Sequence, residues 1–148
     1  MRRTKEYVRG CLIGGAIGDA LGWPVEFMSY RDIVKRYGRE GITSPPYRDG
    51  KKAEITDDTQ MTLFTAEGIL RGAGVSDPLL VLHRAYLRWL HTQGYHVSDE
   101  YNDGWLIGIK ELHARRAPGG TCLSALLSGD IGRMEQPINM SKGCGGVM

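Results

Sequence analysis

The sequence predicts an all-α fold, and three observations predict it. Apolar residues recur at helical intervals of three and four, residues suited to helix ends bound these segments, and no stretch shows sustained strand-type alternation. The chain has 148 residues, the length of about one domain, and its 41% hydrophobic content is enough to build a core. We therefore expect five or six helices in a single domain over residues 1–148.

Two helices and a loop are expected in the N-terminal part. The first helix spans residues 6–21, where apolar side chains have helical spacing and Pro24 prevents a simple continuation. A short second helix is expected to begin near Ser29, with Asp32 at capping-box spacing, and to stop at Gly38. Residues 41–53 combine proline, glycine and charge, which is typical of a surface loop.

The middle of the chain predicts two longer helices. One follows the Thr-Asp-Asp-Thr sequence at residues 56–59 and ends at Gly72, a residue suited to stopping a helix. The other begins at Asp77-Pro78, where an acceptor side chain at the cap is followed by proline in the first turn. Gly94 ends this second helix.

Two further helices are expected downstream. The segment "WLIGIKELHARR", residues 105–116, is predicted to be helical and to be closed by Pro118 and the two glycines after it. Thr121 is expected to cap a short helix that continues through Leu127.

Composition and charge exclude several classes of protein. The net charge of +2 implies no strong attraction to nucleic acid, and no apolar run approaches the roughly 20 residues needed to span a bilayer. No secretory signal opens the chain. The three cysteines are an odd number without a CxxC pair, which predicts reduced thiols in a cytoplasmic protein.

Glycines recur every four residues along the first predicted helix. Each internal glycine costs a helix roughly 1 kcal/mol relative to alanine, so four on one face need a physical reason. Close approach of another backbone in a soluble core explains them better than a membrane dimer, because the helix carries the charged Asp19 and its span is short. The next step of four reaches Glu26, whose carboxylate we expect near a cleft. The four glycines are Gly10, Gly14, Gly18 and Gly22.

Two adjacent carboxylates, Asp57 and Asp58, stand at the start of a helix in "ITDDTQM". One interpretation is N-capping, with Thr56 or Asp57 accepting from free backbone N–H groups and Gln60 bonding back. The other is a site for a hard cation, since carboxylates and a threonine hydroxyl are oxygen ligands suited to Mg²⁺, Mn²⁺ or Ca²⁺. A divalent ion would also remove the repulsion between the pair. Spacing alone leaves both interpretations open.

The last stretch, "SKGCGGVM", is rich in glycine. Its glycines would let backbone N–H groups point into one concavity, which suits an anion. The order of residues matches neither a Walker loop nor a dinucleotide-binding fingerprint. "APGGT", residues 117–121, is a second glycine turn ahead of a helix start, and either glycine segment is also consistent with a simple loop.

Taken together, four segments resemble the ADP-ribosylglycohydrolase family, whose members are all-helical enzymes with an orthogonal multi-helix bundle. They occur in the family's order and span essentially the whole chain, which corresponds to the N-terminal half of the family's domain. The segments are "GCLIGGAIGDALGWPVEF" at 10–27, "ITDDTQMTLFTAEGIL" at 55–70, "RAPGGTCLSAL" at 116–126 and "SKGCGGVM" at 141–148.

The resemblance implies a set of site residues. Thr56, Asp57 and Asp58 would hold one or two Mg²⁺ ions, with Mn²⁺ as an alternative metal. Glu26 would line the same cleft and, with the two aspartates, take part in catalysis. The glycine-rich run would hold the diphosphate and adjacent ribose of ADP-ribose through Gly143, Cys144, Gly145 and Gly146.

The implied activity is Mg²⁺-dependent hydrolysis that removes ADP-ribose from a modified side chain, with arginine favoured, by cleavage at the distal ribose. Expected partners are an ADP-ribosylated protein or a small molecule containing ADP-ribose, with no nucleic acid and no membrane. The family also supplies metal ligands from an Asp-x-Asp-Thr motif near its C-terminus, which these 148 residues lack. The alternative is therefore a catalytically incomplete fragment or module that binds ADP-ribose.

Overall fold

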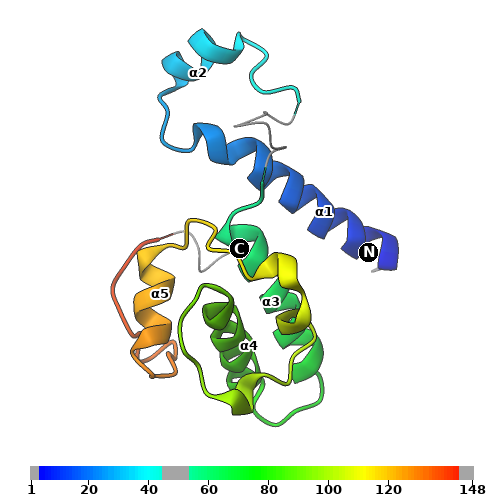
Figure 1. The fold of residues 1–148 in the computed structure, drawn as a ribbon, viewed down its shortest axis with the longest axis vertical. Helices are drawn as coiled ribbons and strands as arrows, with labels where there is room; N and C mark the ends of the chain where they lie inside the picture. The colour runs from blue at the N-terminus through cyan, green and yellow to red at the C-terminus, as the bar shows by residue number, and fades with distance from the viewer. Residues whose placement is uncertain (1–3, 45–53, 144–148) are drawn as a thin grey trace. The chain divides into compact units, whose positions relative to one another are not determined.

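The structure is a computed structural model that describes residues 4–44 and 54–143 (Figure 1). The chain divides into two compact units, Met1–Thr59 and Gln60–Met148. Helices supply the regular structure of the described residues, which contain no strand beyond an isolated bridge between Arg133 and Gln136. The predicted all-α class is thus confirmed. None of the described helices is both long enough and apolar enough to cross a membrane.

The first unit contains α1 (Lys5–Gly22), the 3-10 turn η1 (Trp23–Val25) and α2 (Tyr30–Tyr37). The Ser29 hydroxyl caps α2 by accepting from the Asp32 N–H at 3.2 Å and donates to the Asp32 carboxylate at 2.6 Å. Gly38 ends the helix with φ at 79°, a conformation that favours glycine. Both predicted helices are confirmed. Most of the predicted loop at 41–53 lies outside the described residues.

Among the described residues of the first unit, none packs closely against the glycine face of α1, although the spacing predicts a close neighbour. Within its own unit, a Cβ atom built at Gly10, Gly14, Gly18 or Gly22 would meet nothing within 4 Å. Glycine spacing identifies a helix face that could accept a close neighbour, but it does not identify which segment packs there. In the second unit Gly68 does show such an approach, since a Cβ there would lie 3.1 Å from the Leu82 Cα.

Three longer helices form the second unit, together with 3-10 turns. They are α3 (Asp57–Gly72), whose first three residues belong to the first unit, α4 (Pro78–Thr92) and α5 (Gly120–Leu127). The Asp77 carboxylate accepts from the Leu80 N–H at 3.2 Å at the start of α4, and Gly94 follows the helix with φ at 90°. The predicted boundaries of α3 and α4 are confirmed.

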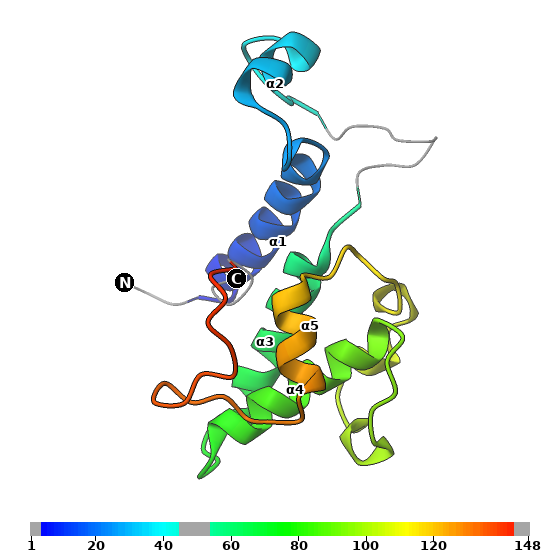
Figure 2. The ribbon, with the colours of Figure 1, turned by 90° about the vertical axis from the view of Figure 1, so that its left-hand side faces the viewer.

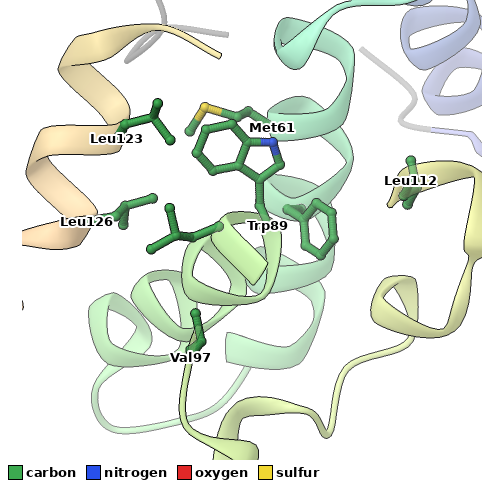
Figure 3. Packing of buried hydrophobic residues seen from close by; sticks show 8 residues of the cluster. Met61, Trp89, Val97, Leu112, Leu123 and Leu126 are labelled. Atoms are coloured by element: carbon green, nitrogen blue, oxygen red, sulfur yellow. The ribbon is translucent and has the colours of Figure 1, made fainter. Parts of the chain in front are cut away.

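The apolar core of the second unit lies where α3, α4 and α5 meet (Figure 2). Phe64 and Trp89 have no exposed surface, and Leu90 is almost fully buried. Leu123 and Leu126 of α5 point toward Met61 and Trp89 (Figure 3). Each fully buried side chain of this size contributes roughly 1.5–3 kcal/mol, so this cluster holds the three helices together.

The helix predicted for residues 105–116 is wrong. This segment instead forms two short 3-10 turns, η3 (Leu106–Gly108) and η4 (Lys110–Leu112), and Ile109 between them is extended. A further 3-10 turn, η2 (Asp99–Tyr101), precedes the segment. Tertiary hydrogen bonds compete with the helix. The Trp105 N–H donates to the Glu67 carboxylate, and the Gln60 side-chain NH₂ donates to the Leu112 and Ala114 carbonyls.

The short helix predicted to end at Leu127 is confirmed as α5, but the predicted cap by Thr121 is wrong. Gly119, not Thr121, occupies the N-cap position of α5, and no side chain caps the helix there. Thr121 lies inside the first turn, and its hydroxyl lies 2.6 Å from the hydroxyl of Ser141.

Candidate functional site

Asp19 of α1 organises the start of α3 within the first unit. Its Oδ2 accepts from the Thr56 N–H at 2.7 Å, and its Oδ1 accepts from the Thr56 hydroxyl at 2.7 Å. Oδ2 also accepts from the Thr59 N–H at 3.3 Å and the Thr59 hydroxyl at 2.5 Å. One carboxylate, 37 residues upstream of Thr56, therefore satisfies two backbone donors and two hydroxyls.

Thr56 completes the cap of the helix. Its hydroxyl donates to Asp19 and accepts from the Asp58 N–H at 3.2 Å. A hydroxyl has one proton and two acceptor lone pairs, so one lone pair of the Thr56 oxygen is left over by these two bonds. Thr56, Asp57 and Thr59 are buried, and Asp58 is half-buried. This arrangement fixes the threonine oxygen beside the acidic pair.

Negative charge is concentrated at this end of α3. Burial, followed by the charges of Asp57 and Asp19, raises the pKa of the Asp58 carboxyl above its ordinary value. The helix N-terminus offsets part of this repulsion, since its backbone dipoles favour anions. Bringing a cation to the site would remove the same repulsion.

The oxygen atoms at this site are of the type that binds a hard cation, but they are fewer than a complete coordination shell needs. Asp57, Asp58 and Thr56 offer carboxylate and hydroxyl oxygens, the ligands that Mg²⁺ takes in proteins. Within residues 4–44 and 54–143, no group of three or more His, Cys, Asp or Glu side chains is placed to hold a metal ion. The three residues would supply part of a coordination shell.

Within the first unit, the structure does not group the other predicted catalytic residue with the acidic pair. Glu26 follows η1 at an exposed position, and the described residues do not join it with Asp57 and Asp58 into a metal-binding group. Gly143 is described and lies in the second unit, near Thr121. The remaining predicted ADP-ribose contacts, Cys144, Gly145 and Gly146, lie outside the described residues.

Sequence reasoning left the role of Asp19 undecided and gave Thr59 none. The only available signal was the threonine on each side of the acidic pair, because Asp19 is too distant in sequence for spacing to join it to α3. The capping interpretation has Gln60 bonding back to the cap, but its side chain is instead buried in the second unit. There its amide contacts Leu112, Ala114 and Gln93.

Comparison with known proteins identifies the family. The family model for ADP-ribosylglycohydrolases matches residues 1–148. The chain belongs to the ADP-ribosylglycohydrolase family. Similar proteins include an uncharacterized protein of Archaeoglobus fulgidus, 33% identical over 132 residues, which is 86% of this chain and 43% of that protein. No solved structure matches the chain.

Two further relatives match shorter stretches of this ADP-ribosylglycohydrolase family member. The ADP-ribosyl-[dinitrogen reductase] glycohydrolase of Rhodospirillum rubrum is 44% identical over 74 residues, which cover 46% of this chain and 25% of that enzyme. The protein YegU of Escherichia coli is 33% identical over 90 residues, 57% of this chain and 27% of its own length. The chain thus matches less than half the length of each of these relatives.

Proposed function

We propose that this chain carries part of the active site of a Mg²⁺-dependent hydrolase that removes ADP-ribose from a modified protein side chain, with arginine as the favoured acceptor. The observation that carries the proposal is the Asp19-held start of α3, where a buried threonine and two adjacent carboxylates converge. Membership of the ADP-ribosylglycohydrolase family supports it.

Each residue has a distinct proposed role. Asp57, Asp58 and the Thr56 hydroxyl would hold Mg²⁺, which when bound would orient the ribose hydroxyls and lower the pKa of a water molecule. Asp19 keeps the Thr56 hydroxyl proton directed to itself, so that the threonine presents a lone pair rather than a proton to the cation.

The reaction would break the bond between the anomeric carbon of the distal ribose and the acceptor nitrogen. Positive charge would develop on the sugar in an oxocarbenium-like transition state, and water would add its oxygen to that carbon. A carboxylate accepts the proton that the water gives up, and the leaving guanidine nitrogen takes up that proton as the bond breaks, so the products are ADP-ribose and unmodified arginine. We assign the carboxylate's role to Glu26, which is exposed beyond η1.

Substitution of the acidic pair tests the proposal in the full-length protein. Asp57→Asn and Asp58→Asn are expected to abolish Mg²⁺-dependent release of ADP-ribose from an ADP-ribosylarginine protein, measured by chromatography of the freed nucleotide. Asp32→Asn is the matched control, because Asp32 lies in the same unit but serves only the exposed cap of α2. Wild-type turnover in both site variants would contradict the proposal.

A second candidate function is ADP-ribose binding without turnover. It is favoured by the small number of acidic ligands that the described residues bring together. Calorimetry would distinguish it: tight binding of ADP-ribose without Mg²⁺, combined with no release of ADP-ribose from modified protein, is the expected result. A requirement for Mg²⁺ in binding would instead favour the hydrolase.

A further inference from the structure

Thr59 has no role in the proposed function so far, although it makes the shortest hydrogen bond to Asp19. Its hydroxyl donates to the Asp19 Oδ2 at 2.5 Å, and its N–H donates to the same oxygen at 3.3 Å. Thr59 is buried, whereas Asp19 is half-buried. The carboxylate of α1 is therefore held on α3 by a residue that is itself shielded from solvent.

The two oxygens of Asp19 have different partners. Oδ2 accepts from both donors of Thr59 and from the Thr56 N–H at 2.7 Å, whereas Oδ1 accepts from the Thr56 hydroxyl at 2.7 Å. Because bonds at both oxygens hold the carboxylate, it cannot rotate without breaking them. Thr59 thus helps to fix where Oδ1 lies, and Oδ1 fixes where the proton of the Thr56 hydroxyl points.

The direction of this proton matters for a cation at the start of α3. The Thr56 oxygen donates its proton to Asp19 and accepts from the Asp58 N–H at 3.2 Å, which leaves one lone pair. A hydroxyl binds a hard cation through a lone pair, and a hydroxyl that rotates freely would turn its proton toward the cation part of the time. Fixing the proton on Asp19 removes that unfavourable arrangement.

We propose that Thr59 is a positioning residue for the cation, because its hydroxyl fixes Asp19 and Asp19 fixes the proton of the Thr56 hydroxyl. This role rests on the proposed function, in which Thr56, Asp57 and Asp58 hold the cation. Partners that orient the ligand residues of a metal strengthen its binding, because the ligands need no reordering when the metal arrives. Thr59 acts in this way through Asp19 and not by contact with the cation.

Binding of Mn²⁺ to the full-length protein tests the role, with the free ion measured by electron paramagnetic resonance. Thr59→Val removes the hydroxyl and keeps the N–H. It is expected to weaken Mn²⁺ binding by about threefold to tenfold, the range for one net hydrogen bond. Thr59→Ser keeps the hydroxyl and should bind Mn²⁺ like wild type, and a loss of affinity as large as in Thr59→Val would overturn the role.

Thr65→Val is the matched control, because it makes the same substitution further along the same helix. The Thr65 hydroxyl donates to the Met61 carbonyl at 2.7 Å and lies 2.9 Å from the Tyr86 hydroxyl, all within the second unit. Thr65→Val should lower the free energy of unfolding and leave the affinity for Mn²⁺ unchanged. Equal losses of affinity in Thr59→Val and Thr65→Val would show general destabilisation and overturn the positioning role.

The route through Asp19 is tested by combining Thr59→Val with Asp19→Asn. Asp19→Asn should itself weaken Mn²⁺ binding, because it removes a negative charge and turns an NH₂ group toward the Thr56 hydroxyl. In the Asp19→Asn background, Thr59→Val should change the affinity by less than about twofold, since no carboxylate is left to position. An effect of Thr59→Val as large as in the wild-type background would contradict this route.

Hydrogen exchange in the wild-type protein is a second measurement, and it requires no variant. Coupling is reciprocal, so contacts that favour the bound cation must themselves be favoured by the cation. Saturating Mg²⁺ should slow exchange at the Thr56 and Thr59 amides and leave the Asp32 amide, at the cap of α2 in the same unit, unchanged. Unchanged exchange at Thr56 and Thr59 while Mg²⁺ binds would overturn the role, even where Thr59→Val does not fold.

Mn²⁺ binding also separates failure of this role from failure of the proposed function. Suppose that the wild type binds Mn²⁺, that Asp57→Asn abolishes binding and that Thr59→Val binds like wild type. The positioning role then fails and the proposed function stands. If the wild type binds neither Mn²⁺ nor Mg²⁺, the two fail together.

Discussion

Replacing Asp19 by asparagine should destabilise the first turn of α3 and so alter the surroundings of Asp57 and Asp58, although neither aspartate is substituted. The carboxylate accepts four hydrogen bonds, two from backbone N–H groups and two from hydroxyls of Thr56 and Thr59. An amide has one acceptor oxygen. Placed where Oδ2 now lies, that oxygen keeps three of these bonds, while the NH₂ group faces the Thr56 hydroxyl and forces it to reorient.

The expected loss of stability follows from these contacts. Hydrogen bonds to a charged acceptor contribute roughly 1.5–3 kcal/mol and neutral ones roughly 0.5–1.5 kcal/mol. Weakening three bonds by about 1 kcal/mol each and losing one would sum to about 4.5–6 kcal/mol if the bonds were independent. Because the four bonds share one acceptor group and the site is partly exposed, we expect about 2 kcal/mol for Asp19→Asn. Asp19→Ala, which removes all four acceptors, should cost about 4 kcal/mol, a large share of the roughly 5–15 kcal/mol of a typical domain.

Hydrogen exchange at the Thr56 and Thr59 amides is the most direct assay, supported by urea unfolding. Both amides should exchange faster in Asp19→Asn, whereas Asp32→Asn, which alters only an exposed cap, should stay within about 0.5 kcal/mol of wild type. Removing the Asp19 charge should also lower the pKa of Asp58, measurable by carboxyl NMR titration. Wild-type exchange and unfolding in Asp19→Asn would refute the reasoning.

Three other variants probe the same structure. Because folding raises the pKa of Asp58, the free energy of unfolding should fall as pH rises from the ordinary carboxyl pKa through the raised one. In Asp58→Asn this fall should be smaller, as measured by urea unfolding at several pH values without divalent ions. Gly104→Ala would place a Cβ 2.3 Å from the Arg88 Nε, so calorimetric melting should show a loss of about 3 kcal/mol, whereas Gly108→Ala, with nothing within 4 Å, should melt like wild type. Gln60→Met removes the amide that bonds the Leu112 and Ala114 carbonyls and one of the partners of the Gln93 amide, so the free energy of unfolding in urea should fall by about 3 kcal/mol. A fall below about 1 kcal/mol would contradict this role of Gln60.

The fold class and most helix boundaries followed from local rules, because the boundaries are themselves local. Ser29 and Gly38 bound α2, and Asp77 starts α4, through contacts within four residues. The helix predicted for residues 105–116 was wrong because the contacts that determine this segment are distant in sequence. Its backbone groups bond to Glu67 and Gln60, about 40 to 50 residues away, and no helical periodicity in the segment itself records those partners.

The same distinction explains the candidate site. Adjacent carboxylates with flanking threonines are visible in the sequence, and their placement at a helix start is confirmed. Asp19 lies on another helix, so its part in the cap required the structure. The glycine face of α1 illustrates the same limit of sequence patterns: its regular spacing predicts a close neighbour, but the described residues of its own unit do not provide one.

The contacts at the start of α3 bear on the choice between a helix cap and a cation site. Sequence spacing set these as competing explanations for the same residues. The structure gives the capping task to Asp19 and Thr56, which together satisfy the N–H groups of residues 56, 58 and 59. These three N–H groups therefore do not depend on the carboxylates of Asp57 or Asp58, and burial together with the charges of Asp57 and Asp19 raises the pKa of Asp58. In the proposed function a divalent cation would stabilise the charged forms of these carboxylates, so the helix cap and the proposed cation site do not compete for the same oxygen atoms.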